Sequence, residues 1–128
     1  MQAILDTHAL IWWLEGSGHL TAEARAAISE EANTIHVSAA TAWEIATKVR
    51  IGKLPSVAPI AGQLADVVAQ HDFDELPVTL ADGERAGLLP LHHRDPFDRM
   101  LIAQAQARDL PLISNETLFD DYGVRRIW

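Results

Sequence analysis

Four carboxylates, spread along this sequence, stand at positions from which they could act together on a metal ion or a phosphate: Asp6, Glu44, Asp98 and Glu116. Asp6 and Glu116 each follow closely after a short apolar run that is typical of a buried strand. Glu44 and Asp98 each lie early in a segment with a helical pattern. Hard divalent cations such as Mg²⁺ and Mn²⁺ prefer oxygen ligands of this kind. The four positions therefore predict a site that activates a water molecule on a bound cation and neutralises a phosphate.

Asp98 is the most unusual of the four because of its position in the segment HRDPFDRMLIAQAQA, residues 93–107. If the helix begins at Pro96, Asp98 shares a face with Leu101, Ile102 and Ala105, at spacings of three, four and seven residues. That face is otherwise apolar, and a charge on the rim of a core is costly unless it has a partner. We expect the partner of Asp98 to be a metal ion rather than a side chain.

Each carboxylate also has a purely structural alternative. Asp6 is well placed to cap a helix that begins near residue 7. Asp95 and Asp98 fit a variant of the capping box, in which the residue at the third helical position reaches back to the cap. Glu44 precedes Lys48 by one helical turn, so the two side chains are expected to form a surface ion pair. The metal hypothesis gains its weight from the combination of positions.

Other side chains that could take part in catalysis or binding are less informative. No zinc-like spacing is present among the nearby histidines, which are expected to have structural or loop roles: His8, His92 and His93. Tryptophans at helical positions are expected in the core or in an interface: Trp12, Trp13 and Trp43. The densest basic cluster of the chain is a candidate track for phosphates: Lys48, Arg50 and Lys53.

The elements that must position these residues alternate between strand and helix. Strands are expected at residues 2–5, 34–38, 75–78, 111–114 and 125–128. Helices are expected at residues 7–15, 21–32, 39–50, 59–72, 80–89 and 96–108. This alternation indicates an α/β fold with three layers, in which helices flank a central, mostly parallel sheet. In such sheets, sites lie beyond the carboxyl ends of the strands, where Asp6 and Glu116 are expected.

Composition narrows the function further. The 128 residues suit a single domain, 1–128, and 48% of them are hydrophobic. There is no cysteine, so disulfides and thiolate metal sites are excluded. The longest apolar run near the start, residues 9–14, is too short for a membrane span, and we expect a cytoplasmic protein. A net charge of −8 disfavours nucleic-acid binding, unless clustered carboxylates hold a cation that reverses the local field.

Taken together, four segments resemble the PIN-domain family, and more narrowly the VapC-type toxins of bacterial toxin–antitoxin modules. The segments are ILDTHALIWWL, SAATAWEIATKVRIGKL, HHRDPFDRMLIAQA and LISNETLFDDYGV, and they occur in the family's order over nearly the whole chain. The resemblance implies a PIN-like fold and Mg²⁺- or Mn²⁺-dependent endoribonuclease activity. It also implies a cognate antitoxin that holds the enzyme inactive, and assembly into a homodimer.

Carried over by position, the resemblance assigns the family's acidic residues to Asp6, Glu44, Asp98 and Glu116, with Asp6 and Asp98 as the main metal ligands. Glu116 is a departure, because the family usually has Asp at the fourth position. The longer side chain could act through a water molecule, or could simply begin the turn after the strand. Ser114 or Asn115 could supply a hydrogen bond in its place.

Two other functions compete with a nuclease. A catalytically weak PIN-like module could act only by docking protein or RNA; Glu116 favours this alternative, whereas the intact Asp6, Glu44 and Asp98 count against it. A phosphatase or a receiver-like domain would also have an aspartate at a strand end. It would need a lysine after a late strand, and the segment PLISNET contains none.

Overall fold

The computed structural model describes all 128 residues and contains a five-stranded parallel sheet in the order β3-β2-β1-β4-β5. The strands are β1 (Gln2–Leu5), β2 (Thr34–Ser38), β3 (Asp74–Leu76), β4 (Leu112–Ile113) and β5 (Arg126–Ile127). The α-helices are α1 (Thr7–Glu15), α2 (Ala22–Ser29), α3 (Ala39–Arg50), α4 (Leu64–Gln70), α5 (Leu80–Leu88) and α6 (Pro96–Arg108). Two 3₁₀ helices, η1 (Pro55–Ile60) and η2 (Thr117–Tyr122), complete the chain.

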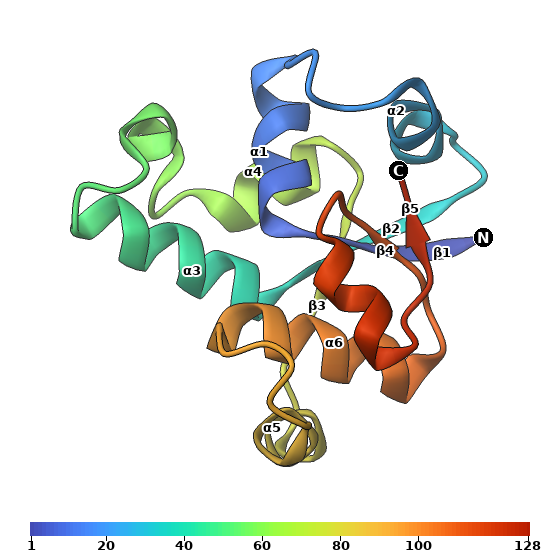
Figure 1. Cartoon of the computed structure of the whole chain (residues 1–128). Coiled ribbons are helices and arrows are strands. Elements are labelled where there is room, and N and C mark those ends of the chain that lie inside the picture. Colours follow the sequence, from blue (N-terminus) through green and yellow to red (C-terminus); the bar gives the residue numbers. More distant parts are fainter.

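Helices cover both faces of the sheet, so the expected three-layer α/β architecture is confirmed (Figure 1). Alternate residues of β1 enter different cores because side chains along a strand point to opposite faces. Ala3 and Leu5 pack with α1 and α2, whereas Ile4 packs with Leu101 and Ile102 of α6. Residues 3–5 of β1 are therefore buried on both sides, as expected for the centre of a parallel sheet.

The expected elements are all present, but several have different bounds, and three of the differences have a clear cause. The helix expected at residues 21–32 ends at Ser29, because the side-chain amide of Asn33 donates to the carbonyl of Ala27 and turns the chain. The helix expected at 59–72 begins only at Leu64, because Gly62 adopts a left-handed conformation with φ of 85°. The preceding residues form η1 instead. The third strand ends at Leu76, before Pro77.

The segment that leads into α6 is held by a single buried arginine. The guanidinium of Arg99 donates to the carbonyls of residues 86, 87, 89, 90 and 93, which form the end of α5 and the following loop. These carbonyls have no helical partner, because a helix ends there without satisfying its last acceptors. Arg99 therefore fixes the loop that carries His93 against the start of α6.

The helices were also compared with the length and hydrophobicity that a membrane span requires, and none of them meets both requirements.

We predict that Arg99→Met lowers the free energy of unfolding by about 3 kcal/mol, because it removes a buried guanidinium and leaves several carbonyls, most of them partly buried, without that donor. The measurement is urea unfolding followed by circular dichroism. The matched control is Arg25→Met, which removes an arginine that donates one hydrogen bond, to the carbonyl of Ser17. An equal loss in the two variants would contradict the role of Arg99 as the clamp of this loop.

Candidate functional site

Asp6 lies at the junction between β1 and α1 and is 5% exposed. Its Oδ1 accepts a hydrogen bond from the backbone N–H of Ala9 at 2.8 Å, so Asp6 caps α1 as the structural alternative predicts. Its Oδ2 accepts a hydrogen bond from the hydroxyl of Ser114, at the end of β4. Burial raises the pKa of Asp6, although these two hydrogen bonds act in the opposite direction. Asp6 is therefore a cap and also a carboxylate fixed at the sheet edge.

The end of β4 contributes Ser114 and Glu116. The hydroxyl oxygen of Ser114, which donates to Asp6, also accepts from the backbone N–H of Glu116 at 2.9 Å. Glu116 in turn caps η2, because its Oε1 accepts from the N–H of Leu118 at 3.1 Å. Of the two hydrogen-bond donors considered in the sequence, it is Ser114 that contacts Asp6, while Asn115 is exposed.

The observed position of Glu44 differs in one respect from the surface ion pair with Lys48 that the structural alternative predicts. The expected pair with Lys48 is present, since Lys48 Nζ donates to Glu44 Oε2. The carboxylate is not on the surface, however, because Glu44 is only 2% exposed and packs between α3 and its neighbours. Its Oε1 has no hydrogen-bond partner and no access to solvent. An orphaned buried oxygen is costly, and an added cation or water molecule would satisfy it.

The start of α6 separates the roles of its two aspartates. Asp95 is the N-cap, and its Oδ1 accepts from the N–H groups of Phe97 at 2.8 Å and Asp98 at 3.2 Å. The expected capping box is wrong, because the carboxylate of Asp98 does not bond back to the Asp95 N–H. That N–H donates to His93 Nδ1 instead, at 3.2 Å. The carboxylate of Asp98 is thereby left for another partner.

The partner of Asp98 in the structure is His93, whose Nε2 lies 2.8 Å from Asp98 Oδ2. Of the two roles expected for His93, structural or loop, this contact supports the structural one. The contact is close but poorly directed, since Nε2 makes no hydrogen bond of normal geometry. The backbone of His93 is fixed by the hydroxyl of Tyr122, which accepts from its N–H at 2.8 Å, and by Arg99. The sequence offered no spacing that would have predicted this pair.

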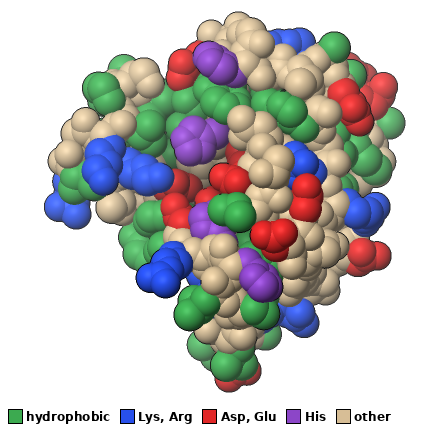
Figure 2. All heavy atoms as spheres, viewed as in Figure 1, with side chains coloured by type: hydrophobic (Ala, Val, Ile, Leu, Met, Phe, Trp, Pro, Cys, Tyr) green, Lys and Arg blue, Asp and Glu red, His purple; other side chains and the backbone are tan.

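All four predicted carboxylates meet in one region. Burial is the largest cause that raises the pKa of Asp98 to about 8, from an ordinary value of 3.8. The next causes are negative charges, those of Asp95, Glu44, Asp6 and Glu116. The pKa of Asp98 thus responds to each of the other three predicted acidic residues, which links them electrostatically. Figure 2 shows acidic side chains gathered in a hollow near the middle of one face, with histidines beside them.

A cation already lies beside this cluster. Burial lowers the pKa of Lys48, but the hydrogen bond with Glu44 and the charges of Glu44, Asp95 and Asp98 outweigh it, so the pKa is raised. Arg50 and Lys53 follow along the exposed end of α3. In Figure 2, basic side chains gather on the left of the hollow, where Figure 1 shows the end of α3. The basic cluster predicted from the sequence thus borders the acidic one.

The carboxylates suit a hard divalent cation, although no three acidic or histidine side chains are close enough to enclose an ion by themselves. Mg²⁺ usually keeps several waters and needs only one or two protein carboxylates. Three observations fit that requirement: buried oxygen donors from separate segments, the strong mutual repulsion around Asp98, and the orphaned oxygen of Glu44. The residues that would hold the ion are Asp6 and Asp98, with Glu44 beside them.

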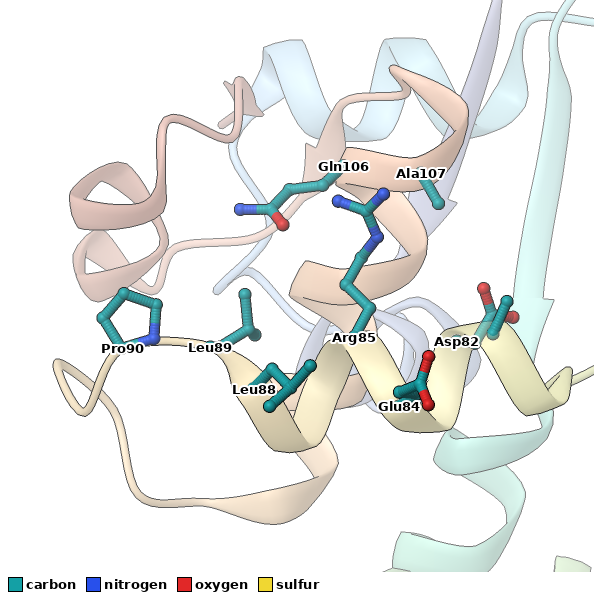
Figure 3. Close-up of a pocket in the computed structure, with 9 residues that line it drawn as sticks. Asp82, Glu84, Arg85, Leu88, Leu89, Pro90, Gln106 and Ala107 are labelled. Atoms are coloured by element: carbon teal, nitrogen blue, oxygen red, sulfur yellow. The ribbon is translucent and has the colours of Figure 1, made fainter.

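A second concave surface lies away from the acidic cluster, between α5 and the end of α6. In Figure 3, Arg85 extends from α5 toward α6, where Gln106 and Ala107 lie. None of the four predicted carboxylates lines this pocket. It therefore does not belong to the candidate site.

Comparison with known proteins points to one family. The PIN-domain family model matches residues 3–124, almost the whole chain. A curated relative, "Ribonuclease VapC16" from Mycobacterium tuberculosis, is 48% identical over 44 residues. These residues make up 34% of this chain, and the match spans only 31% of the length of that protein. The local likeness to this relative is therefore strong but short.

Solved structures resemble the whole fold. The crystal structure of VapBC2 from Rickettsia felis, bound to a DNA fragment from its promoter, aligns over 100% of both chains, with a TM-score of 0.71 and 14% identity. FitAcB from Neisseria gonorrhoeae covers 98% of this chain and 96% of its own, with a TM-score of 0.60 and 15% identity. A toxin–antitoxin complex from Klebsiella pneumoniae covers 90% and 87%, with a TM-score of 0.54 and 20% identity. At these identities the likeness is one of fold.

We predict that Asp98→Asn stabilises the metal-free protein at high pH. Folded Asp98 keeps its proton up to about pH 8, whereas an unfolded aspartate loses it near 3.8. The folded state therefore binds more protons between these values, and the stability of the unmodified protein falls as the pH rises through this window. In EDTA at pH 8, Asp98→Asn should raise the free energy of unfolding by roughly 1–3 kcal/mol. Near pH 4 the difference should be small.

Urea unfolding at several pH values measures this effect. Asp66→Asn is the matched control, because Asp66 is an exposed aspartate of α4. A stability gain for Asp98→Asn that did not depend on pH would contradict the raised pKa of Asp98.

Proposed function

The chain belongs to the PIN-domain family, and from this premise we propose that it is the endoribonuclease toxin of a VapBC-type toxin–antitoxin pair. The observation that carries the proposal is the convergence of Asp6, Glu44, Asp98 and Glu116, from four separate segments, around one buried carboxylate of raised pKa. Such clusters are characteristic of functional sites rather than of stable cores. The name of the Mycobacterium tuberculosis relative supports RNA as the substrate.

We propose Mg²⁺ or Mn²⁺ as the cofactor, held by Asp6 and Asp98. When bound, such an ion lowers the pKa of a coordinated water and offsets the charge of a phosphate. The chain's own residues keep the ligands in place. Ser114 and the N–H of Ala9 fix the two oxygens of Asp6, and the Asp95 cap fixes the backbone of Asp98. Preorganised ligands of this kind are what electrostatic catalysis requires.

The reaction proposed is hydrolysis of a phosphodiester by in-line attack of water. Water forms the new bond to phosphorus, and the bond to the leaving oxygen breaks. This reaction needs no covalent intermediate on the protein, and the chain has no cysteine. Glu44 contributes negative charge and an unused buried oxygen next to Lys48, whose ammonium group is placed to contact a phosphate of the RNA. Glu116, one of whose oxygens caps η2, is proposed to act through water.

We also propose a cytoplasmic protein that assembles as a homodimer and is inhibited by a cognate antitoxin. Fold similarity to a toxin–antitoxin complex of Klebsiella pneumoniae supports the antitoxin partner. The rival proposal is a binding module with a weakened site. It is favoured by the use of the Glu116 carboxylate as a helix cap.

We predict that Asp6→Asn reduces metal-dependent cleavage of RNA by about 100-fold or more while keeping the fold. Asparagine also caps helices well, so the change removes charge and retains the hydrogen bond to Ala9. The assay is incubation of purified, antitoxin-free protein with total RNA and Mg²⁺ or Mn²⁺, with EDTA as the blank. Asp66→Asn is the control and should cleave normally. A folded Asp6→Asn protein that cleaves at the normal rate would contradict the assignment.

Metal binding is tested separately by thermal unfolding in Mn²⁺. At a free concentration about 100 times the dissociation constant, binding should stabilise the folded protein by about 2.7 kcal/mol. Asp98→Asn should lose most of this stabilisation, and Asp66→Asn should retain it. A protein that neither binds Mn²⁺ nor cleaves RNA would favour the binding module.

A further inference from the structure

Trp43 is the largest hydrophobic side chain that the site region leaves open to solvent, with 61% exposure. Trp43 was expected either in the core or in an interface, and this exposure excludes the core. A single exposed aromatic residue is not unusual, so its surroundings decide what it means. Trp43 directly precedes Glu44 in α3, and the ring that it contacts belongs to Phe97, which directly precedes Asp98 in α6. The same two helices thus present an aromatic pair next to two of the site carboxylates.

The aromatic pair has a fixed geometry. The ring centroids of Trp43 and Phe97 are 4.8 Å apart, and the planes meet at 74°, an edge-to-face arrangement. The backbone of Phe97 is fixed in turn by its hydrogen bond to Asp95. Trp43 therefore carries a large π surface that is held in place and still exposed. A preorganised aromatic surface loses little entropy when a planar ligand stacks on it.

Positive charge surrounds the pair. Lys48 Nζ lies 5.9 Å from the centroid of the Phe97 ring and also bonds to Glu44, so it stands between the aromatic pair and the carboxylates. Arg50 and Lys53 continue along the exposed end of the same helix. A planar surface beside a row of cations matches the chemistry of a nucleotide, which carries a base and a phosphate together.

We infer that Trp43 and Phe97 form a stacking platform for an unpaired base of single-stranded RNA, next to the phosphate that the carboxylates act upon. The inference rests on the proposed nuclease function and deepens it, because it assigns the side chains that contact a base beside the carboxylates. Bases within a duplex are stacked on each other and cannot lie on a protein ring, whereas unpaired bases can. Lys48 would then contact the backbone of the stacked nucleotide. The platform selects strand form rather than sequence, since every base has a π face.

The test measures binding apart from cleavage. All proteins carry Asp98→Asn, which prevents cutting, and binding to a labelled, short single-stranded oligoadenylate is followed by fluorescence anisotropy in Mg²⁺. Adding Trp43→Ala should weaken binding by about tenfold, the scale of one base–aromatic stack. Adding Trp43→Phe should restore most of the affinity. Leu88→Ala is the matched control, because Leu88 is an apolar side chain of α5 with 81% exposure.

A second probe removes the bases. The same oligomer with abasic sugars should bind weakly, and with equal affinity to the Trp43→Ala protein and its parent. A blunt duplex should also bind weakly and equally to the two proteins. Equal affinity of the Trp43→Ala and parent proteins for the single strand would overturn the platform, as would the absence of any binding. A change of oligomeric state in Trp43→Ala with unchanged RNA affinity would overturn it too, and would assign this surface to a contact between copies of the chain.

The two proposals fail in different ways. Binding that depends on Trp43, in a chain whose unmodified form cleaves no RNA, would support the platform and contradict the nuclease. Cleavage by the unmodified protein, with binding that ignores Trp43, would support the nuclease and contradict the platform.

Discussion

The burial of neighbouring carboxylates at one edge of a parallel sheet is the constraint on which the rest of this structure depends. Parallel strands all end at the same edge, so the residues that follow β1 and β4 must meet there. The helix that follows β2 brings Glu44 to the same place, and α6 brings Asp98. The result is a group of negative charges in a partly buried hollow, where burial and the neighbouring charges raise the pKa of Asp98.

The surrounding structure holds this unfavourable arrangement together by neutral hydrogen bonds and one adjacent cation. Ser114 and a helix N-terminus fix Asp6, and Lys48 neutralises one side of Glu44. Farther out, Arg99 satisfies the carbonyls of the loop that positions His93 against Asp98. Strain concentrated at a few residues within a well-satisfied frame is typical of functional sites.

The sequence predicted the architecture and the acidic residues because both have local causes. Short apolar runs ending in Asp6 and Ser114 identify the strands, and their shared edge follows from the parallel order. The start of α4 was predicted wrongly, because the left-handed turn at Gly62 is decided by how the loop packs. The His93–Asp98 contact and the exposure of Trp43 were also missed. Both depend on how α3, α6 and the preceding loop lie against each other, and no periodicity within one segment encodes that.

The hydrogen bond between Ser114 and Asp6 joins residues that are 108 positions apart in the chain. β1, which ends just before Asp6, pairs with β4 as well as with β2. The pairing of the first strand is therefore complete only when β4, the last strand but one, is present. Contacts of such long range form late, and a chain leaving the ribosome acquires them only after most of it has been made. The carboxylate edge of the sheet is therefore completed only when nearly the whole chain has been made.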